Sequence, residues 1–178
     1  MRLRISTKKL LYVLLAFFMI LVSLYLYFHF RPVDTIYYKG RKFVFRDNIK
    51  MAKGVPVYPD EKSLHELFWD PNITGITIIF KPLEKEMGYY AVESFELTYK
   101  LSLMYMMNGM NKKFSSLPVN SYENVTSSEG TLKIILVHPR LTNVTLVERR
   151  GNIVYIHGKN PRDFDLATIK TVLVAMGI

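Results

Sequence analysis

The chain opens with one long apolar run, and shorter alternating or periodic segments follow it. Residues 10–30 read LLYVLLAFFMILVSLYLYFHF and contain no Lys, Arg, Asp or Glu. As a helix they would extend about 31 Å, which matches the hydrocarbon thickness of a bilayer. A cleaved signal peptide, the main alternative, would have a shorter apolar stretch followed by small residues, whereas this stretch ends in the bulky residues Tyr27, Phe28, His29 and Phe30. We therefore predict an uncleaved single transmembrane helix.

The orientation of this helix is predicted from charge and from glycosylation sequences. Residues 1–9 carry four basic residues, but the fifteen residues after the apolar run also carry four, so the positive-inside rule gives a tie. Three Asn-x-Thr sequences are glycosylation acceptors of external loops, and they begin at Asn72, Asn124 and Asn143. We predict a cytoplasmic N-terminus and an external, glycosylated domain. The alternative is the inverted topology, with the domain in the cytoplasm beside anionic lipid.

After the apolar run, the pattern changes to that of a folded domain. Residues 35–46 alternate around Lys39-Gly40, which predicts a β-hairpin. Residues 55–59 contain two prolines and are expected to be extended, because residues before proline avoid the helical region. Asp60-Glu61 then begins a short helix that reaches about Trp69.

A β–α–β unit is predicted in the middle of the chain. The runs 75–81 and 132–138 are rich in β-branched residues and predict buried strands. If these strands are parallel neighbours, the crossover between them should be right-handed. Between them, residues 88–110 predict a helix that is apolar around most of its circumference, so it should lie centrally and be covered on more than one side. Its main apolar stripe is Val92, Phe95, Tyr99, Leu103, Met106 and Met110. The pattern does not decide whether the loop 115–130 contains a strand.

The C-terminal part predicts a second hairpin and a final helix. Strands 144–148 and 153–157 flank a Gly151-Asn152 turn signal. Asp163 or Asp165 is expected to cap a helix that runs through Met176. The elements sum to an α/β fold: one transmembrane helix, then a mixed-sheet domain with helices on one or both faces. Its last part would fit a thioredoxin-like arrangement.

Composition narrows the classes of function. The 178 residues suit one domain, and 49% hydrophobic with 22% charged residues excludes intrinsic disorder. The absence of cysteine excludes disulfides, thiolate metal sites and thiol redox chemistry. The net charge is +9, and the basic residues of the domain are interspersed with acids, so nucleic-acid binding is not predicted. Many Lys and Glu residues and no cysteine are typical of a thermophilic prokaryote, and with the sequons they suggest an archaeon.

Candidate chemistry is sparse. Histidines stand at His29, His65, His138 and His157, but no spacing supplies the three ligands that a zinc site needs, so no metal or other cofactor is predicted. His65 could pair with Glu61 on one helix face.

Two carboxylate pairs could perform acid–base catalysis or be structural. Asp163 and Asp165 could instead cap a helix, and Glu93 and Glu96 could form the polar edge of one. No serine lies in a nucleophile elbow. The Met-rich segment 104–110 is either core or an adaptable docking surface. No catalytic residue is assigned.

These observations give two predicted functions. The preferred one is a non-catalytic single-pass membrane protein, with tail 1–9, transmembrane helix 10–30 and external domain 31–178. Its domain would bind or position a partner, as an accessory subunit of a membrane complex or as a cell-surface or surface-layer protein. Its partners are the lipid bilayer and another membrane or cell-surface protein. The alternative is a membrane-tethered hydrolase that uses His138, His157 or the Asp163–Asp165 pair, and it requires a polar cleft where those side chains converge.

Overall fold

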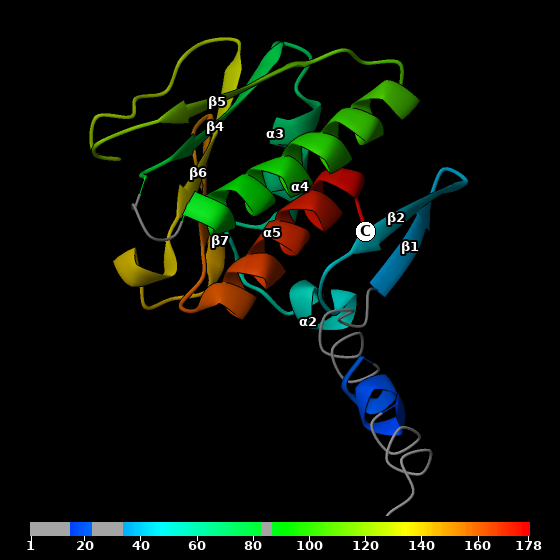
Figure 1. Cartoon of the computed structure of the whole chain (residues 1–178). Coiled ribbons are helices and arrows are strands. Elements are labelled where there is room, and N and C mark those ends of the chain that lie inside the picture. Colours follow the sequence, from blue (N-terminus) through cyan, green and yellow to red (C-terminus); the bar gives the residue numbers. More distant parts are fainter. Residues whose placement is uncertain (1–14, 23–33, 83–86) are drawn as a thin grey trace, which may run out of the picture. The chain divides into compact units, whose positions relative to one another are not determined.

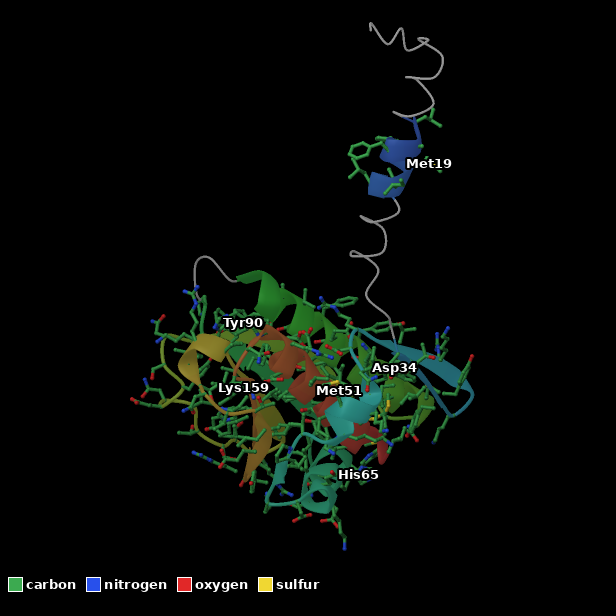
Figure 2. All side chains as sticks on the ribbon, turned by 90° about the horizontal axis from the view of Figure 1, so that it is seen from below. Met19, Asp34, Met51, His65, Tyr90 and Lys159 are labelled. Atoms are coloured by element: carbon green, nitrogen blue, oxygen red, sulfur yellow. The ribbon has the colours of Figure 1, made fainter. Side chains whose placement is uncertain are left out.

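The structure is a computed structural model that describes residues 15–22, 34–82 and 87–178. The chain divides into two compact units, Met1–Val33 and Asp34–Ile178. In the first unit residues 15–22 are helical, and their apolar side chains, Met19 among them, are exposed (Figure 2). The rest of the predicted transmembrane segment 10–30 lies outside the described residues. Within the ranges that are described, no helix has both the length and the apolar character needed to cross a membrane.

The second unit is built on a six-stranded sheet in the order β3-β7-β8-β6-β4-β5. The four strands β8, β6, β4 and β5 are mutually parallel, while β7 runs antiparallel to β8 and parallel to β3. The strands are β3 (Val57–Tyr58), β4 (Gly75–Phe80), β5 (Lys113–Pro118), β6 (Thr131–Val137), β7 (Leu146–Arg150) and β8 (Ile153–His157). The sheet is therefore mixed and mostly parallel.

A separate antiparallel hairpin joins β1 (Asp34–Tyr38) to β2 (Arg41–Phe45). Its turn consists of Lys39 and Gly40, both with positive φ, which is the geometry that a two-residue hairpin turn requires. Asp34 lies next to α2 (Ile49–Lys53), the helix that carries Met51 (Figure 2). The Asp34 carboxylate accepts a hydrogen bond from the Ile49 N–H at 3.0 Å.

The helices pack on one face of the sheet. They are α2, α3 (Glu61–Trp69), α4 (Met87–Met107) and α5 (Pro161–Met176), with a 3-10 turn, η1, at Pro139–Leu141. α4 and α5 lie side by side across the sheet (Figure 1). α5 also contacts α2 and α3, so it is the central helix of this layer.

The other face of the sheet is only partly covered. A small apolar cluster of Ile79, Ile135, Val137 and Ile153 lies there, with Val119, Tyr122 and Val125 of the β5–β6 loop packed on it. The Tyr122 hydroxyl donates to the Leu136 carbonyl at 2.6 Å and accepts from the Lys81 N–H at 2.9 Å. This loop therefore covers the β4–β6 part of the face in place of a helix.

The α/β fold with a mixed sheet and several helices confirms the coarse prediction. Both hairpins form, and the two predicted buried strands are parallel neighbours, β4 and β6. The pattern missed α2, which has only five residues, and it left β5 undecided. β5 is an edge strand with mostly exposed side chains, so it lacks the apolar alternation that reveals a strand.

Two predictions about the long helices were wrong. The N-cap of α5 is Asn160, not Asp163 or Asp165. The Asn160 side chain accepts a hydrogen bond from the Asp163 N–H, and Pro161 occupies the first helical position. The central helix is α5, not α4. Much of the apolar stripe predicted to be covered on α4 faces outward, with Phe95 65%, Tyr99 54% and Met106 62% exposed.

Candidate functional site

A group of buried charged side chains lies between α4 and α5, beside the end of β2. Glu93 of α4 is 2% exposed and forms a hydrogen bond with Asp165 of α5. Burial raises the pKa of Glu93 well above its ordinary value, and the hydrogen bond and negative charge of Asp165 raise it further. Burial therefore favours the protonated form of the Glu93 carboxyl group.

Lys100 lies two turns further along α4 at the edge of the same cluster. It pairs with Glu96 one turn away, and its ammonium lies 4.8 Å from the centre of the Phe45 ring. Burial lowers the pKa of Lys100 to about 8, and the charge of Glu93 partly opposes this shift. The cluster is thus an internal network of opposite charges.

The space inside this cluster is small. Glu93, Asp165 and Thr168 line a cavity of about 10 Å³, which is room for about one water molecule. The buried Thr168 hydroxyl lies beside Glu93, and its hydrogen bond partly opposes the rise in the Glu93 pKa. The hydrogen bond between Glu93 and Asp165 joins α4 to α5.

The structure brings together one member of each predicted carboxylate pair and separates the other two. Glu96 turns to Lys100, and Asp163 accepts hydrogen bonds from Thr145 at 3.1 Å and Asn160 at 2.9 Å. The Glu93–Asp165 pair joins two helices that are distant in sequence. No local spacing signals it, so sequence reasoning missed the pair.

His65 and Glu61 share α3 but do not pair with each other. His65 Nδ1 lies 2.8 Å from the Val174 carbonyl, and the Glu61 carboxylate accepts from the Lys170 ammonium at 2.5 Å. Both side chains therefore bind α5 to α3. His29 lies outside the described residues.

His138 and His157 lie on opposite faces of the sheet. His138 packs against the Tyr90 ring of α4, with 5.4 Å between ring centres, and its Nδ1 accepts from the Arg140 N–H. His157 is the register partner of Val137 on the open face, and burial lowers its pKa. The cleft that the hydrolase alternative needs from these two side chains is not formed. In the described parts of the chain, no three His, Asp or Glu residues lie close enough to hold a metal ion.

The Met-rich segment is divided between core and surface. Met104 is fully buried, Met106 is 62% exposed, and Met107 and Met110 pack at the edge of the core. The core interpretation is therefore confirmed for Met104, and a docking role for the exposed part stays a prediction. The three sequon asparagines, Asn72, Asn124 and Asn143, are exposed and lie outside regular helices and strands.

The uncovered part of the sheet is a flat aromatic and charged surface over β3, β7 and β8, which we call the open sheet face. Tyr58, Glu148 and Tyr155 form one row across these three strands by their register. Arg150 pairs with Glu148 at 2.7 Å and lies over the Tyr155 ring at 5.1 Å. Tyr58 is 53% exposed.

Comparisons with known proteins add no family to this picture. The chain matches no model of a protein family, no curated protein and no solved structure. The fold and the surfaces described above are therefore the basis for the function.

Proposed function

We propose that this protein is a non-catalytic, single-pass membrane protein whose external domain binds or positions a partner protein through the open sheet face. The observation that supports this function is the missing layer on that face. Parallel strands are normally covered on both sides, because their side chains are apolar on both faces. Here β8 belongs to a set of four parallel strands, and among the described residues a loop covers only the β4–β6 part of the second face.

The residues of the open sheet face suit a protein partner. Tyr58, Tyr155 and Arg150 belong to the residue types that contribute most of the binding energy in interfaces. The Arg150–Glu148 ion pair orders the face before binding, so less conformational entropy is lost when a partner arrives. The same row continues onto buried Ile135 and Ile79, which gives the face a rigid support.

The remaining predictions form part of the same proposal. Residues 10–30 would cross the membrane with residues 1–9 in the cytoplasm, and Asn72, Asn124 and Asn143 would carry glycans. The exposure of the three asparagines supports their modification, since a glycan needs an accessible acceptor. The thioredoxin-like arrangement also stays a prediction, and the function does not depend on it.

Site-specific photocrosslinking in intact cells tests the binding function. A photoreactive amino acid is placed at Tyr58 or Arg150 of the full chain, and the matched control carries it at Lys62 on α3, whose side chain is 87% exposed. We expect the same discrete protein adduct from positions 58 and 150 and no such adduct from position 62. A result without a discrete adduct at 58 and 150, or with an identical adduct pattern at all three positions, contradicts the proposal.

A further inference from the structure

A second surface lies on the outer side of α4 and exposes large apolar side chains to solvent. Phe95, Tyr99 and Met106 follow one another at helical spacing along the outer side of α4, and each is more than half exposed. The Phe95 and Tyr99 rings stack at 5.8 Å with an interplanar angle of 4°. Such a stripe is the kind of exposed apolar patch that marks an interaction site.

The β1–β2 hairpin extends this stripe into a continuous surface. Tyr37 and Val44 on its outer side are 71% and 44% exposed. A groove of about 260 Å³ lies between β2 and α4, and its lining joins Lys42, Val44 and Arg46 to Phe95 and Tyr99. We call the surface made of Tyr37, Lys42, Val44, Arg46, Phe95, Tyr99 and Met106 the hairpin–α4 face.

This face is also basic. Residues 34–50 contain five exposed basic residues, and two of them, Lys42 and Arg46, line the groove of this face. The two acids of the same stretch are already engaged, since Asp34 accepts from the Ile49 N–H and Asp47 pairs with Arg162 at 2.9 Å. On α4, Glu96 is paired with Lys100. The hairpin–α4 face therefore attracts anions.

The length of the chain places the start of the hairpin near a membrane, on the proposed function that residues 10–30 form the anchor. Only residues 31–33 separate that segment from Asp34, so β1 begins within about 14 Å of its end. The headgroup layer extends about 5–8 Å beyond the hydrocarbon. All three sequons also lie outside the hairpin and α4, so glycans would leave this face free.

We infer that the hairpin–α4 face docks on the anionic headgroup layer of the membrane that anchors the chain. Tyr37, Phe95 and Tyr99 enter the interface, where aromatic rings are favoured, while Lys42 and Arg46 bind lipid phosphates. The open sheet face lies on the other side of the sheet from α4, so docking turns it away from the bilayer and toward a partner.

The absence of cysteine makes a direct test possible, because a single introduced cysteine can be labelled uniquely. Full-length Tyr99→Cys and Met106→Cys variants carry a fluorophore and are reconstituted into vesicles of phosphatidylcholine with or without phosphatidylglycerol. The matched control is Tyr58→Cys, equally exposed on the open sheet face. A quencher attached to lipid headgroups should quench positions 99 and 106 in the anionic vesicles, and position 58 should stay unquenched.

Charge variants sharpen the test. Lys42→Gln and Arg46→Gln should each lower the ratio of docked to undocked protein about five-fold, and Lys62→Gln on α3 should leave it unchanged. Added salt should weaken docking because it screens the attraction. Equal quenching at positions 58 and 99, or quenching independent of lipid charge, overturns the inference. The inference is also overturned if the fluorophore at position 99 is shielded from solvent only when native membrane proteins are added, because a protein would then cover the hairpin–α4 face.

The two proposals can fail separately. Release of the full chain from vesicles by an alkaline wash would overturn the membrane anchor and with it both proposals. A retained chain that does not dock, yet crosslinks from Tyr58 and Arg150 in cells, would overturn only the lipid contact. A chain that docks on the vesicles but gives no crosslinks from positions 58 and 150 would overturn only the proposed binding of a partner protein.

Discussion

α4 and α5 are neighbouring long helices with opposite relations to solvent. α4 is the more apolar by sequence, yet it leaves three large apolar side chains more than half exposed. α5 contains Lys170, Thr168 and Thr171, yet every residue from Leu166 to Met176 is buried. The difference shows that position in the layer decides burial. α5 is enclosed by α2, α3, α4 and the sheet, whereas one side of α4 is largely exposed among the described residues.

The largest expected effect on stability comes from removing a buried aromatic ring of α5, with an exposed ring of α4 as the comparison. Phe164 of α5 is fully buried, so Phe164→Ala should lower the free energy of unfolding by about 3–5 kcal/mol. Phe95→Ala on α4 should lower it by less than about 0.5 kcal/mol, because that ring is 65% exposed. Denaturant unfolding followed by circular dichroism measures both. Equal losses would mean that the apolar stripe of α4 is packed and would break the comparison.

A smaller effect is expected from the buried ammonium of α5. Lys170 donates to the Glu61 carboxylate at 2.5 Å and to the Lys53 carbonyl at 2.9 Å. Glu61→Gln removes the compensating charge and should lower the free energy of unfolding by about 2 kcal/mol. Glu66→Gln is the matched control, since its pair with Lys62 is exposed and long at 3.9 Å; its loss should be below about 0.5 kcal/mol. Similar losses in the two variants would show that Lys170 does not depend on Glu61.

The smallest effect concerns the carboxyl pair that joins the two helices, and it appears as a pH dependence. The pKa of Glu93 is raised in the folded state, so its contribution to stability is complete below the ordinary value of 4.5 and is lost as the pH rises toward the folded value. Glu93→Gln should flatten this decline and leave the variant more stable at neutral pH by an amount of order 1 kcal/mol.

Unfolding measured from acid to neutral pH checks this expectation. The control, Glu129→Gln in an exposed turn, should keep the wild-type slope. If the Glu93→Gln variant loses stability with rising pH as steeply as the wild type, the Glu93–Asp165 pair is not the source of the pH dependence.

Much of the fold could be predicted because its signals are local. Lys39-Gly40 and Gly151-Asn152 specify their turns by backbone conformation, and alternation specifies the strands beside them. α2 was missed because five residues are too few to show a helical period. Asn160 was missed as the cap of α5 because three polar residues follow one another closely there, and only the observed backbone distinguishes them.

The candidate sites were less predictable than the fold, because each one joins distant segments. Glu93 meets Asp165 only because α4 packs on α5. His138 directly follows β6 and His157 ends β8, and the two side chains lie on opposite faces of the sheet. Residue spacing within one element carries no information about contacts between elements. The candidate pairs Glu93–Glu96 and Asp163–Asp165 therefore did not include the observed pair, Glu93–Asp165.

The sequence by itself determined most elements of this protein, though not α2 or β5, since turn residues, alternation and helical period act over a few neighbours along the chain. It also determined the long apolar segment, the three sequons and the absence of thiol chemistry. Only the tertiary structure decided which apolar side chains are buried. Burial depends on what lies opposite a residue in space, and the same leucine, methionine or aromatic pattern serves a core on α5 and an open surface on α4.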